Sequence, residues 1–212
     1  MATTPNPTAQ LPLQTISVSE SSPLPEPIVT TARLSIRPMH PQDIPSVAFA
    51  QNSPAVARYM SSAFAIPYTL VHATKWIAQN LTPPYNHFAI TLLTDPTTVL
   101  GQFGFMPGQD TEAHTAVLGY WLGEASWGKG IMTEALEAMT AYGFQEKGYL
   151  KLIAKVVAGN AGSERCLKKC GFVVEGVMKK QVLKAGEVND LIFLGLLKEE
   201  WEKRPEAKKN DE

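Results

Sequence analysis

Apolar and polar positions along the chain predict alternating strands and helices. Leu34, Ile36 and Met39 stand at near-alternating positions, which is typical of a strand with one buried face. Strands are predicted on such patterns at 32–38, 86–93, 98–105, 114–122, 151–158, 172–183 and 187–197. Helices are predicted from start and stop signals at 41–52, 54–60, 70–80, 129–147 and 160–170. This order predicts an α+β fold built on one mixed sheet of about seven strands.

Residues 127–133, Trp-Gly-Lys-Gly-Ile-Met-Thr, join a predicted strand to a predicted helix through a glycine-rich turn. Such a turn leaves several backbone N–H groups free, and glycines let an anion approach them closely. The helix start adds a partial positive charge, which stabilises a nearby anionic group by about 0.3–1 kcal/mol. The segment is therefore interpreted as a cradle for phosphates, most simply for a diphosphate.

The same loop has two other interpretations. The segment 123–129 matches the spacing of a nucleoside-triphosphate loop up to its lysine, but Gly130 stands where a Ser or Thr should hold magnesium. No apolar strand ending in Asp supplies a second magnesium ligand. The loop can also be an ordinary strand-to-helix turn in which Gly128 and Gly130 serve geometry alone.

Composition narrows the class of protein. A chain of 212 residues suits one domain, and the net charge of −1 without a basic cluster argues against a nucleic-acid partner. Cys166 and Cys170 share one helical face at a spacing that is poor for a disulfide, and no histidine cluster accompanies them, so we expect no metal. No run of 18 apolar residues exists, so no membrane span is expected. A reducing, cytoplasmic location is the natural expectation.

Proline and charge mark the expected domain limits. Residues 1–30 hold six of the sixteen prolines with many Ser and Thr, which predicts a disordered or extended leader. The first basic residue is Arg33, which is unlike a secretory or mitochondrial presequence. We expect the folded domain at 31–201 and a charged tail at 202–212.

Eight motifs in one order carry a resemblance to a known family. They are 31–37, 66–69 with Ala73 and 76–77, 99–104, 118–122, 127–131 with 133–135, 160–163, 169–172 with 175–176, and Asp190. Together they resemble the GNAT superfamily of N-acetyltransferases, and within it the ribosomal-protein alanine acetyltransferases of the RimJ/RimL-like branch. The resemblance implies an acyl-CoA N-acyltransferase fold with a mostly antiparallel sheet, acetyl-CoA as co-substrate, and an amine acceptor in a monomer or homodimer.

The resemblance also implies which residues bind acetyl-CoA. The diphosphate would sit on the helix start, and the amide-bearing arm would pair with the edge of the preceding strand. That pairing needs the strand to separate from the one at 151–158, so a bulge is expected near Tyr120 or Trp121. Met132 replaces the usual Gly or Ala and would narrow the approach to the diphosphate. The implied cofactor-binding residues are Tyr120, Trp121, Leu122, Trp127, Gly128, Lys129, Gly130, Ile131, Met132, Thr133, Asn160 and Ser163.

Catalytic candidates are fewer. Asn160 is equally an N-cap and a ligand of the cofactor arm, while Ser163 matches a serine that protonates the departing thiolate in this branch. Leu167 stands where many relatives use a tyrosine for that task, and Val117 where branch members often carry a glutamate base. The remaining candidates for a base are Glu124, Asp190, His114 and Tyr120, each with a structural alternative.

A missing base affects some amines more than others. Neutralising an α-amine of pKa about 7.7–8 at pH 7 costs about 1–1.4 kcal/mol, whereas a lysine amine of about 10.4 costs nearly 5 kcal/mol. The chain therefore favours a peptide N-terminus or a small-molecule amine over lysine. A non-catalytic acyl-CoA-binding protein on the same scaffold stays open, as does a magnesium-dependent kinase or ATPase. Aromatic residues expected near the acceptor are Phe64, Tyr68, Tyr85, Phe103 and Trp121.

Overall fold

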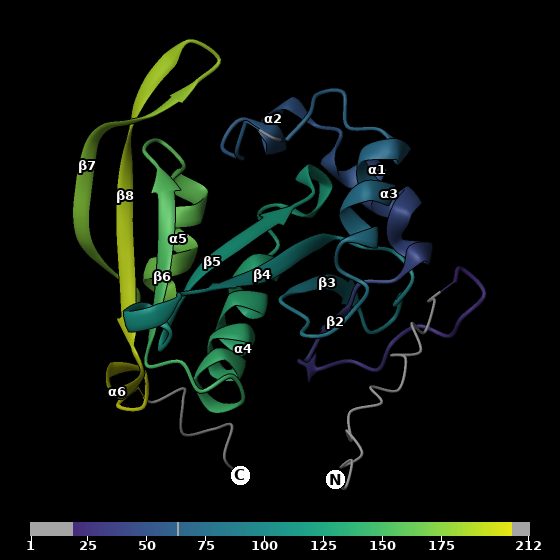
Figure 1. Cartoon of the computed structure of the whole chain (residues 1–212), viewed down its shortest axis with the longest axis horizontal. Helices are drawn as coiled ribbons and strands as arrows, with labels where there is room; N and C mark the ends of the chain where they lie inside the picture. Colours follow the sequence, from purple (N-terminus) through teal and green to yellow (C-terminus); the bar gives the residue numbers. More distant parts are fainter. Residues whose placement is uncertain (1–18, 63, 205–212) are drawn as a thin grey trace, which may run out of the picture.

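The computed structural model describes residues 19–62 and 64–204, and these residues build one sheet in the order β1-β2-β3-β4-β5-β6-β8-β7 (Figure 1). The strands are β1 (Val29–Thr30), β2 (Leu34–Pro38), β3 (His87–Leu92), β4 (Gly101–Pro107), β5 (Thr115–Leu122), β6 (Lys151–Val157), β7 (Val173–Lys184) and β8 (Glu187–Leu197). The predicted α+β fold is confirmed. The sheet of the described residues has eight strands rather than about seven, because Val29 and Thr30 pair with β2 ahead of the first predicted strand.

Helices flank the sheet. The α-helices of the described residues are α1 (Ile44–Gln51), α2 (Pro54–Ala57), α3 (Leu70–Ala78), α4 (Ile131–Gln145), α5 (Ala161–Lys169) and α6 (Lys198–Trp201), with short 3₁₀ turns η1 (Pro41–Asp43), η2 (Asp110–Glu112) and η3 (Glu124–Ser126). Several predicted limits are wrong, among them the start of α4 and the end of α2. α4 begins at Ile131 rather than 129 because its N-cap, Gly130, has a left-handed φ of 74°. α2 ends at Ala57, three residues before its predicted end.

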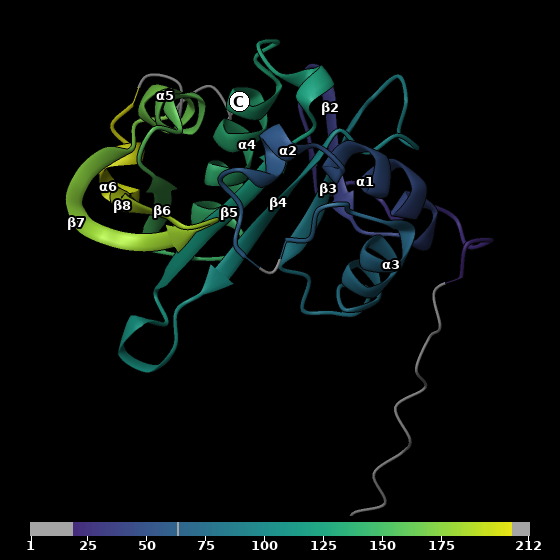
Figure 2. The ribbon, with the colours of Figure 1, turned by 90° about the horizontal axis from the view of Figure 1, so that it is seen from above.

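Helices lie on both faces of the sheet (Figure 2), and an apolar cluster fills the space under each set of helices. The larger cluster packs α4 and α5 against the strands, with Leu136 of α4 and Phe103 of β4 fully buried. The smaller cluster packs α1, α2 and α3 on the opposite face, around residues such as Val47 and Trp121. Within the described residues, no helix is long and apolar enough to cross a membrane.

The sheet divides between its two parallel strands. β5 and β6 are paired only from Thr115↔Lys151 to Leu118↔Ala154. Beyond that point β5 continues its antiparallel pairing with β4 as far as Leu122, and β6 continues with β8 as far as Val157. The predicted bulge near Tyr120 or Trp121 is wrong, because the β4–β5 register is unbroken. The two strands separate instead by diverging after Leu118 (Figure 1).

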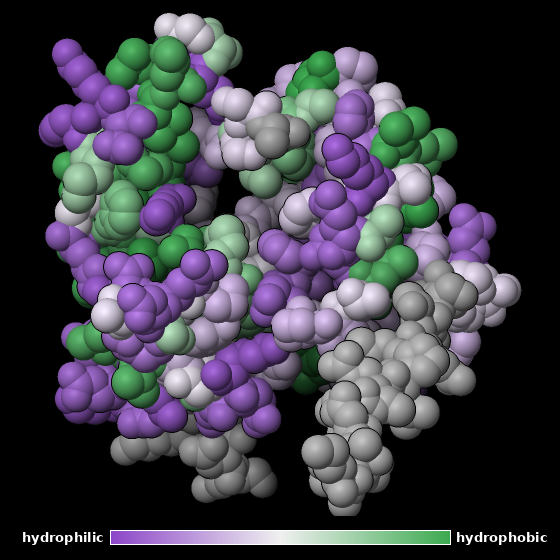
Figure 3. All heavy atoms as spheres, viewed as in Figure 1, coloured by the Kyte–Doolittle hydropathy of each residue, from purple (hydrophilic) through white to green (hydrophobic). Residues whose placement is uncertain are grey.

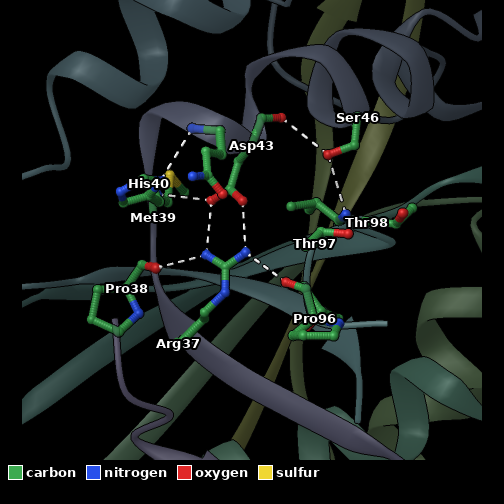
Figure 4. Close-up of polar contacts among 12 residues, drawn as sticks. Arg37, Pro38, Met39, His40, Asp43, Ser46, Pro96, Thr97 and Thr98 are labelled. Carbon is green, nitrogen blue, oxygen red and sulfur yellow. Dashed lines mark hydrogen bonds and ion pairs between the residues drawn. The ribbon is translucent and has the colours of Figure 1, made fainter. Parts of the chain in front are cut away.

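A buried ion pair ties β2 to the helices that follow it (Figure 4). The guanidinium of Arg37 donates to both carboxylate oxygens of Asp43 at 3.0 and 2.7 Å, and both side chains are 1% exposed. Arg37 also donates to the carbonyls of Pro38 and Pro96, and Asp43 accepts the N–H of His40 at 2.8 Å. The bidentate pair and its backbone partners compensate most of the cost of burying two charges.

Removing one charge of this pair should destabilise the fold strongly. We expect Asp43→Asn to lower the free energy of unfolding by about 3–5 kcal/mol, because the Arg37 charge stays buried without its partner. Urea unfolding followed by circular dichroism measures the change. Asp110→Asn, an exposed aspartate in η2, is the matched control and should change stability by less than about 0.5 kcal/mol. Equal effects of the two substitutions would contradict the assignment.

His40 should make the fold sensitive to acid. Its side chain is fully buried, and burial lowers the pKa of its imidazole, although the Asp43 carboxylate opposes the shift. Between that lowered pKa and the ordinary value of 6.5 the unfolded chain binds more protons than the folded one, so stability falls as pH falls through this window. His40→Asn keeps an acceptor for the N–H of Gln42. Urea midpoints measured from pH 7 to 5 should decline less in this variant than in the parent, and parallel declines would refute the role of His40.

Candidate functional site

The split in the sheet exposes one edge of β5. Residues 119–122 pair with β4 on one side and have no partner strand on the other, because the pairing with β6 ends at Leu118. The carbonyl of Leu122 is an exception, since the indole N–H of Trp127 donates to it at 2.7 Å. Figure 3 shows an opening through this part of the molecule, between the β6–β8 side and the β5 side. An extended ligand can therefore lie along β5 as an additional strand.

The glycine-rich turn stands at one end of this edge. Gly128 and Gly130 have left-handed φ values of 73° and 74°, and a Cβ atom on Gly128 would meet nothing within 4 Å. Among the described residues, none accepts a hydrogen bond from the backbone N–H groups of 128–133. These groups and the start of the fifteen-residue helix α4 form a site suited to an anion.

The side chains in the first turn of α4 point away from the glycine-rich turn. Ile131 and Met132 are 6% and 7% exposed and lie in the larger apolar cluster. The expectation that Met132 narrows the approach is wrong, because its thioether is packed in the core and only its backbone faces the turn. Thr133 is also engaged, since its hydroxyl donates to the Cys166 sulfur of α5 at 3.4 Å.

Arg33 and Glu134 hold the turn in place. The guanidinium of Arg33 donates to the carbonyl of Lys129 at 3.0 Å and to the Glu134 carboxylate at 2.6 Å. Thr31 donates its hydroxyl to the same carboxylate at 2.6 Å. Burial raises the pKa of Glu134, but the hydrogen bonds from Thr31 and Arg33 outweigh it, so the pKa is below its ordinary value and the pair stays charged. The sequence motifs contained these residues, but nothing local indicated that they meet.

Tyr120 and Ser163 meet across the opening. The two hydroxyl groups are 2.8 Å apart, although they are 43 residues apart in the chain. Burial raises the pKa of the Tyr120 hydroxyl well above its usual value, and the hydrogen bond to Ser163 opposes this only partly. Both hydroxyls are therefore protonated at neutral pH and can donate a proton or a hydrogen bond. This pair is the one contact between predicted catalytic residues in the described structure.

Asn160 positions Ser163 from the preceding turn. Its side-chain oxygen accepts the N–H of Ser163 at 3.2 Å, which makes Asn160 the N-cap of α5. Gly159, just before it, has its carbonyl held by the hydroxyl of Tyr59 at 3.1 Å. Asn160 is thus the helix N-cap that the sequence offered as its structural role. The Ser163 it positions is the residue through which the start of α5 contacts β5.

The other predicted candidates lie elsewhere. The Glu124 carboxylate accepts the hydroxyl of Ser53 at 2.8 Å. The Asp190 carboxylate accepts from the backbone of Lys180 and the ammonium of Lys179, both at 2.9 Å, and the Lys180 bond most strongly lowers its pKa. It thereby closes the bulge of β7. His114 is exposed at the opposite end of β5.

The predicted aromatic residues mostly fill the core. Phe103 is fully buried, and Tyr68 and Trp121 are 8% and 7% exposed. The indole N–H groups of Trp121 and Trp76 both donate to the side-chain oxygen of Gln102, at 3.1 and 2.8 Å. Tyr85 of the expected set lines a cavity of about 410 Å³ beside β3 and β4.

A side-chain contact links the β7–β8 hairpin to α2 across the opening. The β7–β8 hairpin reaches the end of α2, where the Lys184 ammonium donates to the carbonyls of Ala57 and Met60. Burial lowers the pKa of Lys184. In the described parts of the chain, no group of three or more His, Cys, Asp or Glu side chains is arranged to hold a metal ion.

Comparisons with known proteins agree with this geometry. A family model described as an acetyltransferase (GNAT) domain matches residues 33–173. N-acetyltransferase p20 of Bacillus licheniformis is 30% identical over 176 residues, which cover 81% of this chain and 96% of that protein. The ribosomal protein uS5-alanine N-acetyltransferase of Escherichia coli is 29% identical over 107 residues, 50% of this chain and 55% of that protein. Mycobacterium smegmatis RimJ, solved in complex with CoA-disulfide, has the same fold, with a TM-score of 0.72 at 18% identity over 82% of this chain and 86% of that one.

The contact between Arg33 and Glu134 should control the mobility of the turn. We expect Glu134→Gln to speed amide hydrogen exchange of residues 128–130 several-fold, because a neutral side chain holds Arg33 and the Lys129 carbonyl less tightly. Exchange followed by mass spectrometry measures this directly. Glu146→Gln, an exposed change at the other end of the same helix, should leave these amides unchanged. Unaltered exchange in Glu134→Gln would show that the turn is rigid without the pair.

Proposed function

The chain belongs to the acetyltransferase (GNAT) family, and on this premise we propose that it transfers the acetyl group of acetyl-CoA to a primary amine by direct attack on the thioester. The observation that carries the proposal is the hydroxyl pair of Tyr120 and Ser163 at the split in the sheet. Ser163 lies in the same helix as Cys166, which contacts Thr133 at the glycine-rich turn. Acetyl-CoA has a diphosphate at one end and a thioester at the other, with an amide-bearing arm between them. The site offers a matching feature for each.

The turn at 128–133 would hold the diphosphate. Its six backbone N–H groups are free within the described residues, and Gly128 leaves open space for phosphate oxygens. Trp127 lies beside it, 45% exposed, with its indole fixed on Leu122. The arm would then follow the open edge of β5 at Tyr120 and Trp121, toward Asn160 and Ser163. This gives the binding residues predicted from the sequence a continuous path.

The hydroxyl pair would stabilise the leaving group. When the amine attacks, the carbon–sulfur bond breaks and a CoA thiolate leaves. Ser163 donates its proton to the sulfur, and the Tyr120 hydroxyl can donate in turn to the Ser163 oxygen. The carboxylates of Glu124 and Asp190 contact neither hydroxyl, and we leave them out of the proposed catalytic set.

The acceptor would be an amine of low pKa, either a peptide N-terminal α-amine or a small-molecule amine. The Escherichia coli relative is by its name an alanine N-acetyltransferase of ribosomal protein uS5, which supports a peptide amine as acceptor and the RimJ/RimL-like assignment. No carboxylate contacts the hydroxyl pair in the described residues, and this suits an α-amine better than lysine. Both cysteines are free thiols, which accords with a cytoplasmic location.

Turnover with an amine panel tests the function. We expect release of free CoA thiol when acetyl-CoA is mixed with peptides that carry a free α-amine or with small amines. Peptides with a blocked α-amine and a free lysine should react much more slowly. Thiol release is followed with a colorimetric thiol reagent, and the acetylated product by mass spectrometry. Tight acetyl-CoA binding by calorimetry without turnover of any amine would instead favour the non-catalytic binding protein.

Substitution of the hydroxyl pair tests the proton donor. We expect Ser163→Ala to lower kcat by about 10²-fold, a typical contribution of a positioned acid, with little change in KM for acetyl-CoA. Tyr120→Phe should have a smaller effect, because the Ser163 hydroxyl remains. Ser62→Ala, at an exposed position, is the matched control. Unchanged kcat in Ser163→Ala would remove Ser163 from the mechanism.

A further inference from the structure

The sheet face opposite α4 and α5 has a row of residues that leads to the split. His87 of β3 is directly paired with Gly104 of β4, and Gly104 with Gly119 of β5. Directly paired residues of antiparallel strands place their side chains on the same face, about 4.5–5.5 Å apart at Cα. Gly119 is the first residue of β5 beyond the last pair with β6, so this row ends where the two strands diverge.

The two glycines leave room on this face, and one side chain occupies part of it. A Cβ atom on Gly104 would collide with the imidazole of His87, which therefore lies over the Gly104 backbone. Over Gly119, such an atom would meet only the terminal methyl of Met106, at 3.1 Å. His87 and Met106 also line a cavity of about 410 Å³, which can admit an incoming amine from this face.

We propose that His87 is the catalytic base, which accepts the proton of the amine as the nitrogen attacks the thioester from above Gly119. The proposal rests on the acetyl transfer proposed above and supplies the base that the sequence did not identify. It places the base and the hydroxyl pair of Tyr120 and Ser163 on opposite faces of the split. His87 was not among the candidates from the sequence, because nothing local distinguishes it from any histidine at the start of a strand.

The surroundings keep His87 ready to accept a proton. Among the described residues, no hydrogen bond engages either of its ring nitrogens, and its ring packs edge-on against Trp76 at a centroid distance of 4.9 Å. Burial lowers its pKa, so it is neutral at pH 7. The nearby titratable groups are the Tyr85 phenol, which lines the same cavity, and the Lys147 ammonium, which donates to the Tyr85 carbonyl at 3.2 Å. Met106, the side chain of β4 that lies near His87, carries no charge.

The cavity beside His87 suits an amine substrate whose remaining part is polar and uncharged. Its volume is about 410 Å³, and no Lys, Arg, Asp or Glu lines it. Besides Tyr85 and His87, the polar lining consists of the amide side chains Gln79, Asn80 and Asn86 with Thr82. Amide groups both donate and accept, as a peptide backbone requires. The cavity therefore favours the first residues of a peptide over a polyamine, which would need carboxylates.

The proton balance is complete with groups of this chain. The amine nitrogen forms a bond to the thioester carbon, and the carbon–sulfur bond breaks. The nitrogen loses one proton to a ring nitrogen of His87, and the sulfur gains one from Ser163. After attack the nitrogen carries a positive charge and is a far stronger acid than the free ammonium, so an imidazole of lowered pKa suffices as the acceptor. Solvent then exchanges both protons.

The pH profile of a substituted enzyme tests this role. The probe is acetyl-CoA with a tripeptide amide that begins with a free alanine. In the parent, the slope of log kcat/KM against pH should be about one below pH 8, where the α-amine protonates. It should rise to about two only below the lowered pKa of His87, where the imidazole protonates as well. In His87→Gln, kcat/KM should fall about 10²-fold, and the slope should stay at one. KM for acetyl-CoA should not change.

Two controls keep the result specific. His114→Gln, at an exposed histidine on the far end of β5, should keep the parent rate and profile. A thermal melt of His87→Gln shows whether it is folded, and His87 ring signals in the parent's NMR spectrum should shift when the tripeptide and CoA are added together. Parent-like rate and slope in His87→Gln would overturn the proposal. If the parent transfers no acetyl group, the function proposed above fails, and unshifted ring signals would then also remove His87 from the acceptor site.

Discussion

The parallel pairing of β5 with β6 ends at Leu118 and Ala154, and the site depends on this limit. Backbone groups at a sheet edge need partners, and parallel neighbours that diverge leave those groups available to a ligand. The divergence is held from both sides, since β4 keeps β5 in register to Leu122 while β8 keeps β6 in register to Val157. The hairpin of β7 and β8 then crosses to α2 through Lys184, so the two halves of the sheet are joined again above the opening.

Charges around the site are arranged so that the anion-binding turn is fixed before a ligand arrives. Arg33 comes from the turn before β2, contacts the Lys129 carbonyl, and is itself held by Glu134 in the first turn of α4. Glu134 would otherwise place a negative charge next to the proposed diphosphate site. Its pairing with Arg33 neutralises that charge, so the positive end of α4 and the free N–H groups dominate locally. The same β2 is fixed at its other end by the buried pair of Arg37 and Asp43.

In the proposed mechanism, the proton donor and the proton acceptor lie on opposite faces of the sheet. Tyr120 meets Ser163 of α5, whereas Gly119 shares the opposite face of the sheet with His87, whose ring packs against α3. A donor and an acceptor that touched each other would exchange a proton without substrate. With the thioester between them, the amine loses its proton on one side while the sulfur gains one on the other. The glycine at position 119 permits this, because a larger side chain would fill the space of the incoming amine.

Local signals in the sequence were enough to locate most of the helices and strands and the glycine-rich turn, because caps, alternation and left-handed glycines act within a few residues. The resemblance to the GNAT family placed Ser163 and Tyr120 among the candidates. The local signals did not show that these two hydroxyls meet over a separation of 43 residues, that Arg33 reaches Glu134 101 residues away, or that Met132 points into the core. They did not identify His87 either, because its position over Gly104 follows from the register of β3 against β4. Contacts between distant residues depend on how strands pair and how helices pack, and only the tertiary structure decided those.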